Sequence, residues 1–305
     1  MKDIIHINSI AEVHQHMGLE APRHPLVSIY KHDEITPNHE FAGKNLSINL
    51  YQVMFKMCKS GSLSYGRSSY DYHEGTLIFM APGQVVNFGH EEEWDRNEMK
   101  GGWSLNFHPD LIRRSHLGQH IDDYSFFSYE VNEALHLSDM EKQTIGEIRD
   151  KIIHEYRANI DKHSQKLIIS NIELMLDYCT RFYDRQFYTR ENLNKDTISR
   201  FERLLKEYYA SDKPLETGLP TVKYCGAELN LSANYLSDLL KKETGRNTQE
   251  HIHNFIVDRA KTNLLNTTEP VSQIAYSLGF EYPQHFSKVF KKKTGVSPAE
   301  YRHSN

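Results

Sequence analysis

The sequence predicts an α+β chain that is mainly β in its N-terminal part and entirely helical in its last third. Two observations predict this division. Between residues 45 and 108, short apolar and aromatic runs alternate with Gly, Asn and Pro, which is typical of several short strands in a sandwich or small barrel. After residue 196, apolar residues recur at helical spacing. A chain of 305 residues, of which 38% are apolar, is long enough for two such domains.

The clearest helical pattern runs from residue 271 to residue 293. Its apolar positions are Val271, Ile274, Ala275 and Leu278 before Gly279, and Phe286, Val289 and Phe290 after it. Two helices joined by a tight turn that contains glycine form a helix-turn-helix pattern. The second helix carries amide, imidazole, hydroxyl and ammonium groups, which match the base edges and phosphates of DNA. The alternative for this stretch alone is an amphipathic hairpin with a solvated, lysine-rich face.

A second copy of the hairpin lies upstream and favours DNA binding over that alternative. The matched positions are Val222 with Val271, Leu229 with Leu278, Leu236 with Phe286, Lys241 with Lys291 and Thr244 with Thr294. The offset grows from 49 to 50 residues within the hairpin, so the second copy contains one extra turn residue. The repeat predicts two helix-turn-helix motifs, over 221–244 and 270–294.

Residues 196–305 resemble the DNA-binding domain of the AraC/XylS family of bacterial transcription regulators. The resemblance rests on I-A-Y-S-L-G-F at 274–280, F-S-K-V-F-K-K-K-T-G at 286–295 and S-P-A-E-Y-R at 297–302. It implies an all-α domain in which a single linking helix, expected over 249–265, joins the two motifs. Such a helix would let one chain read successive major grooves, which lie about 34 Å apart.

The resemblance also assigns the DNA-facing residues of both recognition helices. They are Asn234, Ser237 and Asp238 in the first helix, and Gln284, His285, Ser287 and Lys288 in the second; Lys241 and Lys291 are further DNA-binding candidates, for contact with phosphate. Gln284 can pair with adenine and Lys288 with guanine, whereas the other lysines are better suited to phosphates. Two residues depart from the family pattern: Asp238 stands where a basic or amide residue is common, and Pro283 cannot donate a hydrogen bond. We therefore expect the first hairpin to bind DNA more weakly than the second.

At the N-terminus, the resemblance implies a cupin-like β-barrel that binds a small effector, followed by a helical pair that dimerises. We expect this sensor and dimerisation domain over 1–187, with the helical pair over 139–187. A polar linker is expected over 188–195, before the DNA-binding domain at 196–305. Ser138 and Glu141 form an S-x-x-E capping box at the start of the pair. The alternative for the pair is that both apolar faces are buried within one monomer.

Several side chains in the barrel region are candidates for lining an effector pocket. They are Tyr51, Tyr72, His73 and Trp103. The alternative for each is a structural role, because a barrel interior needs aromatic side chains in any case. Metal-binding cupins need a paired H-x-H, which this segment lacks, so we expect no metal site.

Catalytic motifs are also missing, and we predict that the chain is not an enzyme and uses no cofactor. Some DNA-repair alkyl-transfer proteins carry a DNA-binding domain of this type together with a zinc-bound cysteine cluster. The three cysteines of this chain, Cys58, Cys179 and Cys225, are too scattered to form one.

Charge and targeting signals set the expected partners and location. The net charge of −5 is unevenly distributed, since 11 Lys and Arg stand against 8 Asp and Glu from residue 221 onward. Scattered cysteines and the lack of a signal peptide or a long apolar run predict a cytoplasmic location. The expected partners are double-stranded DNA, a small-molecule effector, a second copy of the chain and, for a transcription activator, RNA polymerase. The alternative is a ligand-independent regulator whose barrel only oligomerises.

Overall fold

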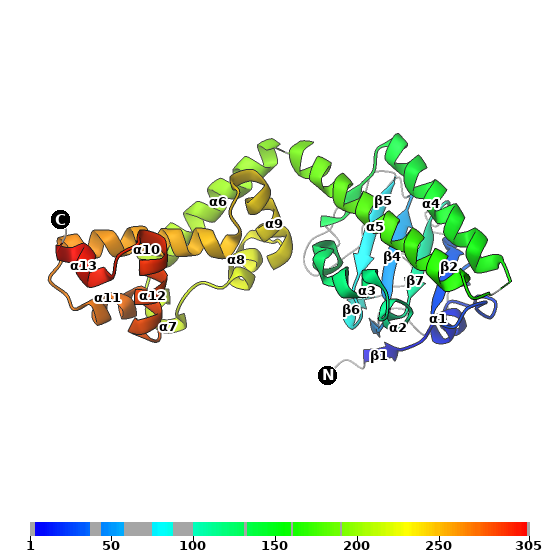
Figure 1. The fold of residues 1–305 in the computed structure, drawn as a ribbon, viewed down its shortest axis with the longest axis horizontal. Helices are drawn as coiled ribbons and strands as arrows, with labels where there is room; N and C mark the ends of the chain where they lie inside the picture. Colours follow the sequence, from blue (N-terminus) through cyan, green and yellow to red (C-terminus); the bar gives the residue numbers. More distant parts are fainter. Residues whose placement is uncertain are drawn as a thin grey trace. The chain divides into compact units, whose positions relative to one another are not determined.

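The computed structural model describes residues 4–36, 44–57, 75–87, 100–130, 133–159, 161–189 and 191–303. It divides into two compact units, Met1–Tyr188 and Thr189–Asn305, which we call the N-terminal and C-terminal units (Figure 1). The first combines sheets with helices, and the described part of the second is helical. The predicted α+β class is therefore confirmed.

Two sheets form the centre of the N-terminal unit. The larger has the strand order β2 (Val27–Lys31), β7 (Trp103–Phe107), β4 (Tyr51–Lys56), β5 (Thr76–Met80) and β8 (Leu135–His136), all antiparallel. The smaller has the order β1 (Ile4–Ile7), β3 (Asn45–Ile48) and β6 (Gln84–Asn87), with β1 parallel to β3. Among the described residues these sheets do not close into a barrel, so the predicted cupin-like barrel is not confirmed.

The two faces of the five-stranded sheet differ in chemistry. Side chains alternate along each strand, so Val53, Leu105 and Phe79 share one face through the registers of β4 with β7 and β5. This face packs on helices, since the Phe79 ring lies 4.4 Å from Phe126 and 6.2 Å from Tyr183 of α5 (Ser164–Thr189). The opposite face contacts the smaller sheet, because Tyr30 belongs to the core cluster that contains residues of β1 and β3. We call these the helix side and the inner side.

Further short elements complete the N-terminal unit. They are α1 (Ile10–His16), η1 (His32–Glu34), α2 (Pro109–Ile112), α3 (His116–His120), η4 (Ile121–Asp123) and η5 (Ser125–Ser128). Helix α4 (Asp139–Arg157) then begins at the predicted capping box: the Ser138 N–H donates to Glu141 at 2.8 Å, and Ser138 Oγ accepts from the Glu141 N–H. Arg185 of α5 pairs with Glu141 at 2.6 Å and so joins the ends of the two long helices.

The predicted linker at 188–195 is largely helical. Helix α5 continues to Thr189, and α6 (Glu191–Ala210) includes the second half of the predicted linker. The polar composition that suggested a loop reflects exposure instead, because α6 buries only one stripe, which includes Phe201, Leu205 and Tyr208. The C-terminal unit thus begins with a helix several residues earlier than predicted.

Seven further helices follow in the C-terminal unit, and most of them share one apolar core. They are α7 (Lys213–Thr217), α8 (Val222–Leu229), α9 (Ala233–Thr244), α10 (Thr248–Asn266), α11 (Val271–Ser277), α12 (Pro283–Thr294) and α13 (Pro298–His303). Helices α8 and α9 form the first hairpin, α11 and α12 form the second, and α10 connects them (Figure 1). Across the described parts of the chain, no helix is long and apolar enough to span a membrane.

Candidate nucleic-acid interface

The two hairpins are built with the same local geometry. Asn230 follows α8 with φ 58°, and Gly279 follows the last turn of α11 with φ 91°. Both residues adopt the left-handed conformation that reverses a helical chain, which Asn and Gly tolerate best. They are 49 residues apart, the offset that the repeat gives for the first helix of each hairpin.

The repeat extends into the helix that follows each hairpin. Asn247 caps α10 and exchanges hydrogen bonds with Glu250, at 2.9 and 3.0 Å. Ser297 and Glu300 make the same pair of hydrogen bonds at the start of α13, at 2.7 and 3.2 Å. The chain therefore leaves both hairpins through an equivalent capping motif.

Helix α9 presents three of its four candidate residues in one row. Asn234, Asp238 and Lys241 are spaced at i, i+4 and i+7, so they share a face; Asn234 and Lys241 are exposed and Asp238 is half-buried. Ser237 is placed differently, because its hydroxyl donates to Thr248 Oγ1 of α10 at 3.2 Å. Its geometry favours a role in holding α9 against α10.

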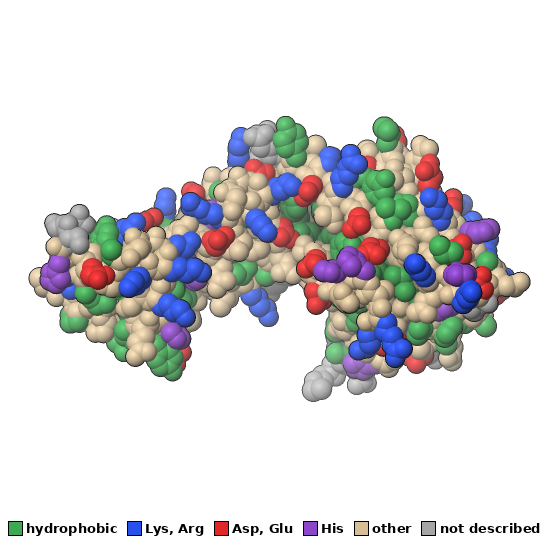
Figure 2. Space-filling model, in the orientation of Figure 1, with side chains coloured by type: hydrophobic (Ala, Val, Ile, Leu, Met, Phe, Trp, Pro, Cys, Tyr) green, Lys and Arg blue, Asp and Glu red, His purple; other side chains and the backbone are tan. Residues whose placement is uncertain are grey.

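Helix α12 presents a longer polar face. Gln284, His285, Lys288 and Lys291 are all exposed on its first three turns. Ser287 donates its hydroxyl to the backbone carbonyl of Pro283 at 3.0 Å, so only its lone pairs remain for a ligand. Figure 2 shows blue Lys and Arg side chains around α10 and α12 on the visible face of this unit.

Two neighbours of this face were not among the predicted residues. Tyr282 precedes α12, is 54% exposed and packs edge-on against His285 at 5.5 Å. In the sequence, the signal for Tyr282 was an aromatic residue directly before Pro283, the proline that begins the helix. His253 of α10 lies near Lys292 and Lys293, and burial followed by these two charges lowers its pKa. His253 therefore stays neutral beside the lysines at neutral pH.

The two predicted effector residues that the structure describes, Tyr51 and Trp103, lie apart on the sheet. Tyr51 stacks on Phe107 at 5.1 Å, whereas Trp103 stacks on Phe55 at 5.9 Å, at the other end of the same strand pair. Both side chains lie on the helix side of the sheet. Trp103 lines a cleft of about 480 Å³ beside α4, together with Arg149. Tyr72 and His73 lie outside the described residues.

The inner side of the sheet carries buried polar side chains, which we call the inner polar layer. Its members are His14, Ser28, Tyr30, His32, Gln52, Ser104 and Asn106. Gln52 Nε2 donates to Asn106 Oδ1 at 2.5 Å, and His32 Nε2 lies 2.8 Å from Ser104 Oγ. Gln52 Oε1 and Asn106 Nδ2 are buried and make no hydrogen bond of ordinary geometry among the described residues, although the Tyr30 hydroxyl lies close to the Asn106 side chain. The signal in the sequence was the alternation in β7, where Ser104 and Asn106 stand between large apolar residues.

The described residues offer little support for a metal site or for a reactive cysteine. They contain no group of three or more His, Cys, Asp or Glu side chains able to hold a metal ion. Cys179 and Cys225 are buried and unpaired, and burial raises the pKa of the Cys225 thiol to about 12. Cys58 lies outside the described residues. Such thiols are poor nucleophiles at neutral pH.

With this geometry, the C-terminal unit is of the helix-turn-helix class. Residues 225–304 match a protein-family model described as a helix-turn-helix domain. The C-terminal domain of the chain belongs to the AraC/XylS family.

Known relatives match the same part of the chain. The uncharacterized HTH-type transcriptional regulator YtdP of Bacillus subtilis (strain 168) is 34% identical over 82 residues, which are 27% of this chain and 11% of that protein. The HTH-type transcriptional activator RhaR of Escherichia coli (strain K12) is 26% identical over 136 residues, 44% of this chain and 46% of that protein. The chain thus spans from about a tenth to about half the length of these relatives. Both are described as transcription regulators, not enzymes.

A solved structure shares part of the sequence. The C-terminal domain of AraT, a response regulator from Geobacillus stearothermophilus, is 28% identical and covers 36% of this chain and 85% of its own, with a TM-score of 0.32.

Proposed function

We propose that the chain is a sequence-specific DNA-binding transcription regulator. The observation that carries the proposal is the pair of equivalent hairpins, each with an exposed row of hydrogen-bonding and cationic side chains on its second helix. A helix with such a row suits the major groove, because amide and ammonium groups match the donor and acceptor pattern of the base edges.

The length of α10 supports simultaneous contact by both hairpins. Its 19 residues span about 28 Å at ~1.5 Å per residue. This is close to the separation of about 34 Å between successive major grooves on one face of DNA. One chain would therefore place α9 in one groove and α12 in the next.

The second hairpin is proposed to contribute most of the specific contact. Its face is longer and includes Gln284 and Lys288 at i and i+4, suited to adenine and guanine respectively. In α9, Asp238 brings a carboxylate close to the phosphates and can be accommodated best by a cytosine amino group. Lys241 and Lys291 are proposed to contact phosphates, which position the protein but do not read the sequence.

Selection of DNA fragments tests this function directly. The purified chain would be incubated with sheared genomic DNA of its source at about 150 mM salt, which weakens non-specific phosphate binding. We expect enrichment of sites that contain two conserved blocks about one helical turn apart. Enrichment of no sequence, both with the whole chain and with residues 189–305 alone, would contradict the proposal.

The inner polar layer is proposed to be where the N-terminal unit senses an effector. Leaving a buried amide atom unpaired costs about 1–3 kcal/mol, so two such atoms side by side, Gln52 Oε1 and Asn106 Nδ2, favour a ligand that supplies an acceptor and a donor. The layer contains no buried carboxylate, Lys or Arg, which favours a small neutral molecule. Trp103 and Tyr51 then have structural roles.

The alternative is a ligand-independent regulator whose N-terminal unit only oligomerises. Screening small neutral hydroxyl- or amide-bearing molecules for an increase in melting temperature distinguishes the two. Stabilisation of wild type that is lost in Asn106→Leu supports sensing. A stabilising ligand with the same effect on Asn106→Leu would place the site elsewhere.

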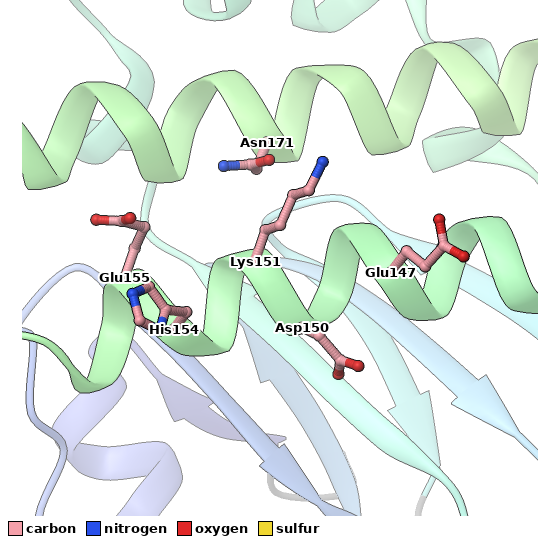
Figure 3. A pocket seen from close by; sticks show the side chains of 6 residues that line it. All are labelled: Glu147, Asp150, Lys151, His154, Glu155 and Asn171. Atoms are coloured by element: carbon pink, nitrogen blue, oxygen red, sulfur yellow. The ribbon is translucent and has the colours of Figure 1, made fainter.

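Helix α5 is proposed to form a dimer interface. Leu167 and Leu174 are one heptad apart on α5 and are 44% and 40% exposed, with Asn171 between them. A groove of about 330 Å³ between α4 and α5 runs beside them, and in Figure 3 Lys151 extends from α4 toward Asn171. An apolar stripe bordered by charged side chains of both signs is typical of a helix that pairs with a second copy.

Substitution of Leu174 by Glu is expected to weaken the dimer at least tenfold, because the carboxylate would lose its hydration on association. Sedimentation velocity over a range of concentrations measures the change in the dissociation constant. Met140→Glu is the matched control, since Met140 is 81% exposed at the start of α4 and lies off the stripe. Equal dissociation constants for the two variants, or a monomeric wild type, would overturn the assignment.

A further inference from the structure

Two glycines of the C-terminal unit bring distant backbone segments into direct contact. Gly279 lies in the turn of the second hairpin, and Gly218 ends α7 with φ 80°. A Cβ atom on Gly279 would lie 2.7 Å from the carbonyl oxygen of Gly218 and 2.8 Å from its carbonyl carbon. No side chain fits at Gly279, so the turn of the second hairpin rests on the backbone that leads into the first.

The hydroxyl group of Tyr208 holds this contact from the other side. It donates to the carbonyl oxygen of Gly218 at 2.8 Å and lies 2.7 Å from Thr217 Oγ1. Tyr208 belongs to α6, is 3% exposed, and packs edge-on against Tyr224 of α8 at 5.3 Å. The second hairpin is therefore joined to α6 and to the first hairpin through Tyr208, Gly218 and Gly279, which we call the glycine bracket.

The bracket is a second connection between the hairpins, separate from α10. A connection through one helix fixes a distance along its axis but leaves bending and rotation of the second hairpin less restricted. A backbone contact away from that axis restricts both motions. We propose that the glycine bracket sets the placement of α12 relative to α9, and so the separation and helical phase of the two DNA blocks that one chain reads. This inference rests on the proposed function.

The bracket is tested with variants matched for backbone strain. Gly279→Ala introduces a side chain at φ 91° into the contact, whereas Gly295→Ala introduces one at φ 85° where no atom lies within 4 Å. Both changes place a side chain at a similar positive φ, so a difference between the two variants reports the contact with Gly218 and not the backbone strain. Tyr208→Phe removes the hydroxyl group and keeps the buried ring.

Each full-length variant would be used to select duplexes from a random-sequence DNA pool. We expect wild type and Gly295→Ala to enrich two blocks at a single separation. Gly279→Ala is expected to enrich one block, or two blocks at several separations, and to bind the wild-type sequence at least tenfold more weakly than Gly295→Ala does. Tyr208→Phe is expected to broaden the range of separations.

The possible outcomes separate this inference from the proposed function. If wild type enriches no sequence, the proposed function fails and the inference falls with it. If wild type enriches two blocks, and Gly279→Ala and Tyr208→Phe retain the single separation and the affinity of Gly295→Ala, the inference alone is overturned. If circular dichroism shows that Gly279→Ala is unfolded, Tyr208→Phe decides alone. A broadened range of separations between the two blocks then supports the inference, and a single unchanged separation overturns it.

Discussion

Replacing Gln284 or Lys288 by Ala is expected to weaken binding to the selected DNA site by about 1–3 kcal/mol, or roughly 5- to 150-fold. Both side chains are exposed on α12 and neither belongs to the core, so the folded domain should be unchanged. The loss should also be specific to sequence. Gln284→Ala should relax selectivity at one base pair and Lys288→Ala at another, since each side chain reads a base edge.

Lys291→Ala is the matched control for these variants. Lys291 lies one turn further along α12 and is proposed to contact phosphate. Its substitution should weaken binding about equally for all sequences and reduce the salt dependence by about one counterion. Fluorescence anisotropy with the selected duplex and with a scrambled duplex, each at several salt concentrations, measures both effects. If Gln284→Ala and Lys288→Ala bind the selected duplex as wild type does, α12 presents a different face to DNA.

The C-terminal unit could be predicted from sequence because its signals are local. Helical spacing acts within a few turns of chain, and the repeat at 49 to 50 residues is a comparison of two such local patterns. A helix face is fixed by periodicity once its buried residues are known. The family resemblance assigns Ser237 to the DNA side, and this stays a prediction, while in the structure its hydroxyl donates to Thr248. That contact depends on how α9 meets α10, which periodicity does not encode.

The N-terminal unit was harder to predict because its signals are not local. The side of a sheet on which Trp103 or Tyr51 lies is set by pairing between distant strands and by what covers each face. Large aromatic side chains suggested a pocket; in the structure Tyr51 stacks on Phe107, whereas Trp103 stacks on Phe55 and lines a cleft beside α4. The inner polar layer was visible only as polar residues in alternation within strands, which also fits a solvated face. Burial of Gln52 and Asn106 follows from the second sheet, whose pairing the sequence pattern does not specify.

Acidification is expected to destabilise the N-terminal unit through His32. Burial, followed by the nearby charge of Lys56, lowers the pKa of His32 to about 4 from its ordinary value of 6.5, although Asp33 acts in the opposite direction. Because the pKa of His32 is lower in the folded chain than in the unfolded chain, the unfolded chain takes up the proton at a higher pH as the solution is acidified. The stabilising contribution is therefore complete above pH 6.5 and is lost as the pH falls toward 4. A shift of this size corresponds to about 3 kcal/mol.

Urea unfolding followed by tryptophan fluorescence measures this loss in the right part of the chain, since Trp94 and Trp103 both precede residue 189. His32→Gln keeps a polar group near Ser104 but cannot take up a proton. When the pH is lowered from 7.5 to 4.5, the unfolding free energy of wild type should therefore fall by about 2–3 kcal/mol more than that of His32→Gln. The exposed His163, changed to Gln, provides a control that should follow wild type at every pH. Parallel pH profiles for wild type and His32→Gln would mean that His32 is protonated as readily in the folded chain as in the unfolded one, and that the inner polar layer is open to water.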